Sequence, residues 1–404
     1  MHRAGVDDDT SSGFLLRRSC PCQERHQHDD AQFWLHGIVG VLWIIYGYAI
    51  AFPALGGTAT YGIPGVFNID LAHMGLENLI EVPDGATVPP LVFAAFQATF
   101  AMITVALISG AIADRAKFGA WMVFAGVWAT IVYFPVASWI FNFTVEDGEI
   151  TSGGWLVYNV GALDFAGGTA VEINSGAAAL ALALVLGKRI GFAKGVHKPH
   201  NVPFVLLGAG LLWFGWFGFN AGSAIAADGV AAIALINTMA AGAAGIIGWL
   251  IVERIKDGKA TSVGAASGAV AGLVAITPSC AYLTPSWALV LGILTGVLCA
   301  LAVELKFTFG FDDSLDVVGI HLVGGLIGTL FLGFFATEFG LIYSGSFDQL
   351  GKQAIAAFSV LIYSFTLSFS IGWVIDKTMG FRVKNEDELA GIDLVMHGEE
   401  SYDY

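Results

Sequence analysis

Charged residues are scarce in this chain, which therefore lacks the polar surface of a soluble protein. Only 13% of its 404 residues are Asp, Glu, Lys or Arg, whereas 56% are hydrophobic. Soluble domains carry about 25% charged residues. The 52 glycines are typical of helices that approach one another closely within a bilayer. The composition therefore predicts an all-α polytopic membrane protein that has the lipid bilayer as its solvent.

Basic residues and cysteines are also few. Lys and Arg number 18 against 33 Asp and Glu, and the net charge of -15 argues against nucleic acid as a partner. The four cysteines form no disulfide framework, and Cys280 and Cys299 fall in apolar segments, where we expect buried thiols. No H-E-x-x-H or G-x-S-x-G motif is present, so the chain is not expected to be an enzyme or to hold a cofactor.

The apolar residues form ten successive segments, each near the roughly 20 residues that a membrane-spanning helix needs. Basic residues follow the second, fourth, sixth and eighth segments, whereas loops 56–89 and 143–153 are acidic and contain no Lys or Arg. The positive-inside rule predicts a multi-pass protein of the cell membrane with its C-terminus in the cytoplasm. We place the segments at 37–55, 90–113, 119–142, 166–187, 201–222, 229–251, 262–277, 285–305, 316–337 and 354–379.

Two flanking parts differ from the membrane domain, which we place at 37–380. Residues 1–36 are charged, and their cysteines and histidines fit no standard zinc spacing, so a disordered tail is favoured over a metal site. Residues 381–404 are acidic and form either a solvated cytoplasmic end or a regulatory arm. The candidate metal ligands that we set aside are Cys20, Cys22, His26 and His28.

Two ionisable residues lie within apolar segments far apart in the sequence. Glu172 follows Asp164 by eight residues and lies about one turn inside the fourth segment, while His321 lies in the ninth. An ionisable side chain at this depth is costly unless it faces a partner or a polar path. A lone histidine is often only an interhelical hydrogen bonder. We nevertheless expect Glu172 and His321 to face each other and to hold or relay a proton.

Aromatic residues gather near two of these segments. Phe100 lies in the second segment, Trp216 and Phe219 lie between glycines at the end of the fifth, and Ser223 directly follows the fifth. Any single ring could simply pack against lipid or a neighbouring helix. Taken together, the rings could attract a small cation, a contribution of up to about 2 kcal/mol once water is removed. A serine hydroxyl beside them could accept a hydrogen bond from an ammonium ion.

The chain resembles the ammonium transporter (Amt/Mep/Rh) family, in register from Gly37 to the tail. The resemblance implies ammonium or ammonia transport by a homotrimer with one pore per subunit. It also implies that two inverted five-helix repeats and a C-terminal helix frame each pore. The motifs that carry it are Trp43-Ile44-Ile45-Tyr46-Gly47-Tyr48-Ala49, Asp164-Phe165-Ala166-Gly167-Gly168-Thr169, Gly215-Trp216-Phe217-Gly218-Phe219-Asn220-Ala221-Gly222-Ser223 and Asp316-Val317-Val318-Gly319-Ile320-His321.

The resemblance also implies residue roles. Phe100 and Phe219 correspond to a stacked phenyl gate, and Ser223 to the hydroxyl of an external ammonium site. The aromatic wall of that site falls on Phe141, with Trp139 nearby. Asp164 corresponds to an aspartate that orders the external site. His321 corresponds to the second of two facing pore histidines. Trp216 belongs to the aromatic motif beside the pore, and Asp316 lies at the start of the helix that carries His321.

Glu172 departs from the family pattern, which usually has the first pore histidine there. Some members, notably fungal ones, have an acidic residue at this position. A Glu–His pair can be an ion pair or a neutral pair with the proton on Glu. We therefore expect a different pH dependence and less strict rejection of other cations. Glu172→His should change both, and currents unchanged in both properties would contradict the idea.

The N-terminus also departs from the family, because the first of its eleven helices is missing from the chain as written. Codon degeneracy allows residues 7–29, read one base later, to encode a Phe-Tyr-Gly-Gly turn followed by Ala-Lys-Asn, which is typical of that helix. We therefore hypothesise that residues 1–36 are an out-of-frame product. The nucleotide sequence of the gene tests this, since stops in the shifted frame would exclude it.

Two other functions are alternatives to transport. An ammonium sensor on the same scaffold could signal through the C-terminal tail, although a sensor usually carries an appended signalling domain. A membrane hydrolase using Glu172 and His321 lacks supporting motifs. The short tail favours transport, with a PII-type signal protein as the regulatory partner that the resemblance implies.

Overall fold

The computed structural model describes residues 25–55, 57–146, 148–192, 199, 201–390 and 392. In these ranges nine helices are long and apolar enough to cross a membrane, and a tenth apolar helix is shorter, at 15 residues. The fold is therefore that of a polytopic helical membrane protein. The hypothesis about the reading frame concerns residues 1–36, of which residues 1–24, including Cys20 and Cys22, lie outside the described ranges.

The spanning elements follow the ten predicted segments. In chain order they are α2 (Arg25–Leu42) with η1 (Trp43–Gly47) and α3 (Tyr48–Ala51); α4 (Pro90–Ile112); α5 (Phe118–Trp128) with η3 (Ala129–Tyr133) and α6 (Phe134–Phe141); η5 (Gly168–Ile173) with α7 (Asn174–Leu186); α8 (Val202–Gly222); α9 (Gly229–Lys256); α10 (Ser262–Ile276); α11 (Pro285–Ala302) with α12 (Leu305–Phe309); η7 (Val318–Leu322) with α13 (Val323–Phe335); and α15 (Asp348–Thr378).

Two helices start six or more residues before the predicted segments. Helix α2 begins at Arg25 and runs without a break through the boundary that we placed after residue 36. Helix α15 begins at Asp348, six residues before the predicted segment. Its first turns contain Gln349 and Gln353, which lower the local hydropathy. Both amide side chains are hydrogen-bonded to neighbouring protein groups, so this polar turn is accommodated inside the protein.

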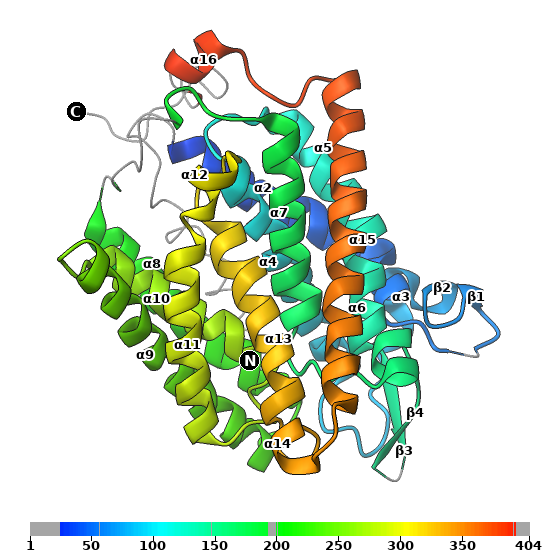
Figure 1. Ribbon diagram of the computed structural model, residues 1–404. Helices are drawn as coiled ribbons and strands as arrows, with labels where there is room; N and C mark the ends of the chain where they lie inside the picture. Colours follow the sequence, from blue (N-terminus) through cyan, green and yellow to red (C-terminus); the bar gives the residue numbers. More distant parts are fainter. Residues whose placement is uncertain are drawn as a thin grey trace.

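The helices pack into two groups that are joined by α13, which contacts α10 and α11 of one group and α15 of the other (Figure 1). Helices α8, α9, α10 and α11 contact one another on one side, and the long helix α15 lies along α7 and α13 on the other. Glycines allow the closest approaches, since a Cβ on Gly248 of α9 would lie 2.3 Å from the Ile293 carbonyl oxygen of α11. Close packing of this kind stabilises helices in membranes, where the hydrophobic effect between helices is absent.

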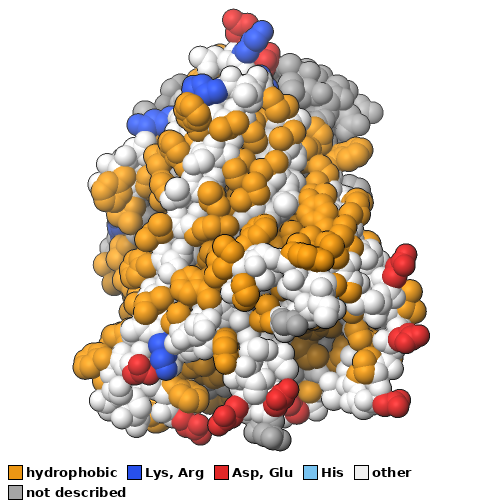
Figure 2. All heavy atoms as spheres, turned by 90° about the vertical axis from the view of Figure 1, so that its right-hand side faces the viewer, with side chains coloured by type: hydrophobic (Ala, Val, Ile, Leu, Met, Phe, Trp, Pro, Cys, Tyr) orange, Lys and Arg blue, Asp and Glu red, His pale blue; other side chains and the backbone are white. Residues whose placement is uncertain are grey.

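Short elements cover the two ends of the bundle. The antiparallel hairpin β3 (Phe143–Glu146) with β4 (Glu149–Gly153) and the short helix α14 (Leu341–Ser344) lie at one end, whereas the hairpin β1 (Thr60–Ile63) with β2 (Phe67–Asp70) projects from the side of the bundle (Figure 1). The short elements η2 (Leu71–Leu79) and η4 (Trp155–Val160) follow β2 and β4 in the chain. The short helix α16 (Asn385–Ala390) lies at the opposite end (Figure 1). Figure 2 shows an apolar band between the ends, with acidic side chains gathered at the hairpin end.

Several spanning helices contain π-helical turns, in which the backbone widens by one residue. Such turns occur at η1, η3, η5 and η7 within the spans. The two ionisable residues that we expect to face each other both fall in them, Glu172 in η5 and His321 in η7. π-Helical turns are rare and frequently mark functional sites. Their positions therefore indicate a functional site where η5 and η7 meet.

Candidate functional site

Glu172 and His321 meet where η5 and η7 cross. The Oε2 atom of Glu172 lies 2.7 Å from Nδ1 of His321, and the two residues are only 1% and 5% exposed. The expected juxtaposition is therefore present. A carboxylate can only accept, so Nδ1 donates if Glu172 is ionised and accepts if Glu172 is protonated. Either way a proton lies between the two groups, in a buried position.

The second carboxyl oxygen of Glu172 is free of such a bond. Its Oε1 is buried and has no hydrogen-bond partner among the described residues. A buried unpaired carboxyl oxygen is costly, because it has lost its bonds to water. This atom can therefore accept a hydrogen bond from a proton donor that reaches the pair.

An aspartate lies eight residues before each member of the pair. Asp164 lies eight residues before Glu172, and its carboxylate accepts hydrogen bonds from the backbone N–H groups of Gly167 (2.9 Å), Gly168 (2.7 Å) and Thr169 (2.7 Å) and from the Thr169 hydroxyl. Burial raises the pKa of Asp164, and these hydrogen bonds oppose the rise. The acid thus holds the start of η5 in place and has little capacity left to bind a ligand directly.

Asp313 caps the start of the other helix. It lies eight residues before His321 and accepts hydrogen bonds from the N–H groups of Val317 (3.1 Å) and Val318 (2.7 Å). Asp316, which we predicted at this helix start, directly precedes the helix but pairs with Lys306 Nζ at 2.7 Å. The capping role therefore belongs to Asp313. Asp313 precedes His321 by eight residues, as Asp164 precedes Glu172. This repeated spacing is the sequence signal that could have identified Asp313 as the cap.

Two phenyl rings from different helices, α4 and α8, stack against each other. Phe100 and Phe219 stack with their ring centroids 4.3 Å apart and their planes at 26°. Phe141 meets Phe100 edge-on at 5.9 Å, and Trp216 lies 5.5 Å from Phe219. Four of the predicted aromatic residues therefore form one cluster, drawn from α4, α6 and α8.

Polar groups border this cluster. The Ser223 hydroxyl donates to the Phe219 carbonyl at 2.8 Å, so its lone pairs remain available to a donor. The Trp216 indole Nε1 donates a hydrogen bond to the Thr277 hydroxyl at 2.8 Å. This bond holds the indole ring in its position next to Phe219. Thr277 was not among the predicted residues, because nothing in its local sequence distinguishes it from other membrane threonines.

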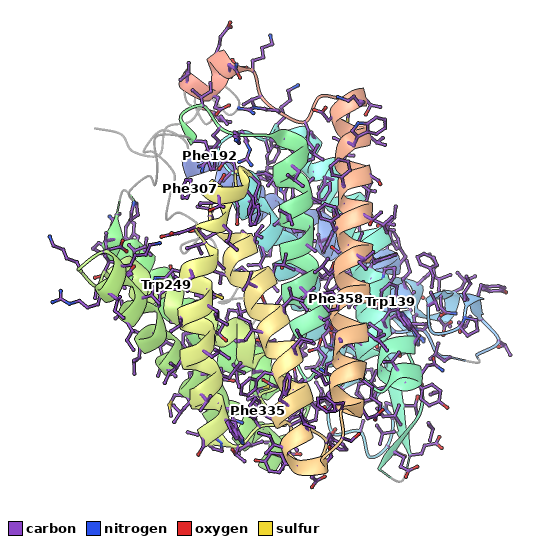
Figure 3. All side chains as sticks on the ribbon, in the orientation of Figure 1. Trp139, Phe192, Trp249, Phe307, Phe335 and Phe358 are labelled. Carbon is purple, nitrogen blue, oxygen red and sulfur yellow. The ribbon has the colours of Figure 1, made fainter. Side chains whose placement is uncertain are left out.

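Trp139 is not brought to the cluster. Its indole Nε1 donates to the Val66 carbonyl at 2.5 Å, and its ring packs against Trp155 and Tyr363. It lies beside α15 in Figure 3. Because Trp139 and Phe141 are two residues apart on α6, they face different directions. The structure thus places Phe141, and not Trp139, beside the stacked rings.

Buried charges tie together the end of the bundle that carries α16. Arg189 pairs with Asp114 and Asp312, each at 2.9 Å, and the fully buried Arg115 donates to the Ser314 hydroxyl at 2.7 Å. Burial alone would raise the pKa of Asp312, but the hydrogen bond from Arg189 and the charge of Arg115 bring it below its usual value. The network therefore joins three loops through ionised groups.

The tail after α15 joins this end of the bundle. Arg382 donates to the Leu186 carbonyl at 3.0 Å and pairs with Glu388 at 2.7 Å. Glu388 also accepts from the Ile190 N–H at 2.6 Å, so the tail contacts the loop after α7. Among the described residues no group of His, Cys, Asp and Glu could hold a metal ion, and Cys280 and Cys299 are buried and unpaired.

Comparisons with known proteins give one consistent family. The model of the Ammonium Transporter Family matches residues 27–402. An ammonium transporter of Mycobacterium tuberculosis is 52% identical over 389 residues, covering 91% of this chain and 81% of that protein. An ammonium transporter of Bacillus subtilis is 43% identical over 377 residues, covering 90% and 87%.

Solved structures give the same result. Mep2 of Saccharomyces cerevisiae is similar with a TM-score of 0.84 and 32% identity, covering 95% of this chain and 88% of that one. A protein described as a sensor Amt protein is similar with a TM-score of 0.87 and 27% identity, covering 98% and 95%.

Proposed function

This chain belongs to the ammonium transporter family, and from this premise we propose that it carries ammonium or ammonia across the cell membrane past the Phe100–Phe219 rings and the Glu172–His321 pair. The proposal rests on one observation above all: a carboxyl group and an imidazole share a hydrogen bond of 2.7 Å inside a membrane-spanning bundle. Structural roles alone seldom justify the cost of such a pair in an apolar setting.

The outer part of the proposed path recruits the cation. The faces of Phe141 and Trp216 attract the cation, and the Ser223 hydroxyl accepts a hydrogen bond from one of its N–H groups. Asp164 contributes by fixing the start of η5, not by contact with the ion. Trp139, which does not lie beside the stacked rings, has no direct part in this proposal.

The stacked rings impose the chemical selection. Hydrated Na⁺ and K⁺ would lose their water shells between Phe100 and Phe219, whose rings offer no oxygen ligand in exchange. Ammonium differs because it can give up its proton and continue as neutral ammonia. The free Oε1 of Glu172 and the His321 ring are the groups that receive or relay this proton.

The test is ammonium-evoked current in proteoliposomes. Glu172→Gln and His321→Ala should each reduce the current strongly or alter its pH dependence, because each removes one member of the pair. Glu304→Gln and His73→Gln are matched controls, since both residues lie away from the pair, and should leave the current unchanged. Full current and an unchanged pH profile in both pair variants would exclude the proposed role.

The assembly, orientation and regulation are proposed with the same function. Each subunit belongs to a homotrimer, and two inverted five-helix repeats frame its pore. The end with Lys117, Lys188 and α16 faces the cytoplasm, in accord with the positive-inside rule. A PII-type signal protein binds there, where Arg382 and Glu388 hold the tail against the loop after α7.

A second candidate function is ammonium sensing through the tail. It is favoured by the likeness to the sensor Amt protein, whose structure covers nearly the whole chain. The same proteoliposomes separate the two candidates. A sensor would bind ammonium at the aromatic site without evoking current, whereas a transporter would do both.

A further inference from the structure

Two glycines lie one turn beyond the members of the buried pair. Gly176 follows Glu172 by four residues, and Gly325 follows His321 by four residues. Glu172 and His321 are 149 residues apart, as are the two glycines and the capping residues Asp164 and Asp313. The two pore helices therefore carry the same small residue at the same position relative to their polar side chain.

Each glycine touches the helix that carries the other member of the pair. A Cβ on Gly176 would lie 2.4 Å from the backbone nitrogen and 2.7 Å from Cα of Leu322, the residue after His321. A Cβ on Gly325 would lie 2.9 Å from Cβ of Glu172 and 3.1 Å from the Gly168 carbonyl oxygen. These distances leave no space for a methyl group, because nonbonded carbon atoms prefer separations of about 3.5–4.0 Å.

At Gly176 the atoms in the way are the backbone nitrogen, Cα and Cβ of Leu322. At Gly325 they are Cβ of Glu172, the Gly168 carbonyl oxygen and, 3.0 Å away, Cγ1 of Ile173. A Cβ is fixed to its own Cα, so like the backbone it cannot swing aside as the tip of a long side chain can. A methyl group at either position must therefore move one pore helix away from the other. Glu172 and His321 start from those same helices and meet at 2.7 Å, so a small displacement lengthens their hydrogen bond beyond the range in which it holds.

We infer that Gly176 and Gly325 are positioning residues for the Glu172–His321 pair, each setting the distance of the opposite helix. This inference rests on the proposed function only for its effect on transport. The geometric part concerns the hydrogen bond itself and can be tested without measuring transport.

The variants Gly176→Ala and Gly325→Ala test the inference, with Gly248→Ala as the matched control. Gly248 is equally tight, since its Cβ would lie 2.3 Å from the Ile293 carbonyl oxygen, but it joins α9 to α11 and touches neither pore helix. Proteins labelled with ¹⁵N-histidine are measured by solid-state NMR in lipid. The His321 signal is the one that His321→Ala removes.

Both pore-helix variants should shift the His321 Nδ1 signal away from its hydrogen-bonded position, and Gly248→Ala should leave it in place. The dependence of current on pH in both variants should also become the same as in Glu172→Gln. The double variant Glu172→Gln with Gly325→Ala should then show the same dependence as Glu172→Gln alone. An unchanged His321 signal in both variants, or an equal shift in Gly248→Ala, overturns the inference. A shifted signal with a normal current profile would instead contradict the proposed proton role and leave the positioning role standing.

A measurement on the unaltered chain covers the case in which the alanine variants do not fold. Protein labelled with ¹³C at glycine Cα and glutamate Cβ should give a short-range cross-peak that Glu172→Gln removes. Its absence would mean that Gly325 does not lie against Glu172 and would overturn the inference.

Discussion

Single residues differ sharply in how their charge is accommodated, and Asp313 is the clearest case. Its carboxylate caps the helix of His321, yet burial raises its pKa to about 6, and the charge of Lys306 offsets this only in part. A folded-state pKa above the unfolded value of about 3.9 means that the folded protein binds this proton more tightly. Stability from this group therefore falls as pH rises from about 4 to 6.

Asp313→Asn should remove this dependence. Relative to the variant, the unaltered protein should gain about 1 kcal/mol of stability between pH 7 and pH 5, because the carboxyl group becomes protonated over that range. Unfolding of both proteins in detergent at the two pH values measures the difference. Equal changes in the two proteins would show that Asp313 is not the titrating group.

At the scale of one element, helix α15 is fixed by amide side chains as well as by apolar packing. Gln353 is fully buried, and its amide accepts from the Leu163 N–H at 2.7 Å and donates to the Leu163 carbonyl at 2.7 Å. Gln349 adds a bond to the Gln353 oxygen at 2.9 Å. These bonds hold the loop before η5, and with it the Asp164 cap, against α15.

Gln353→Leu should therefore destabilise the protein, since it leaves the Leu163 N–H and carbonyl without these partners. We expect a loss of about 1–2 kcal/mol, the range for buried groups left unpaired and for bonds between membrane helices. Ser370→Ala is the control on the same helix, because its exposed hydroxyl bonds only to the Thr366 carbonyl of its own helix. Thermal unfolding in detergent compares the two, and similar midpoints would contradict the assigned role.

Over the whole molecule, charge is divided between the two ends. The hairpin end carries many exposed acids (Figure 2). The opposite end holds the buried arginine network around Arg115 and Arg189. In the proposed orientation the acidic end faces outward and attracts cations from solution. The exposed acids of that end are Glu77, Glu81, Asp84, Glu146, Glu149, Asp228, Glu338 and Asp348.

Such attraction is long-ranged and depends on salt. The ammonium concentration for half-maximal current should rise between ionic strengths of about 0.01 and 0.15 M, because the screening length falls from about 30 to 8 Å. Replacing Glu77, Glu81 and Asp84 by their amides should weaken this dependence without changing the maximal current. Identical salt dependence in the variant would rule out a role for these acids in recruitment.

The sequence by itself determined the class of molecule, the succession of spans and the two ionisable residues within them. These follow from hydropathy and composition, which act locally along the chain, and from motifs shared with a family. The start of α15 was misplaced because buried amides such as Gln353 lower local hydropathy while their hydrogen bonds are satisfied by residues far along the chain. The start of α2 was misplaced because its first turns are charged and polar in sequence.

Only the tertiary structure decided how the site is built. It placed Phe141 rather than Trp139 beside Phe100, because helical geometry points residues two apart in different directions. It assigned the second cap to Asp313 and revealed the contacts of Gly176 and Gly325. These features depend on the approach of segments 149 residues apart, and no pattern within either segment specifies that distance.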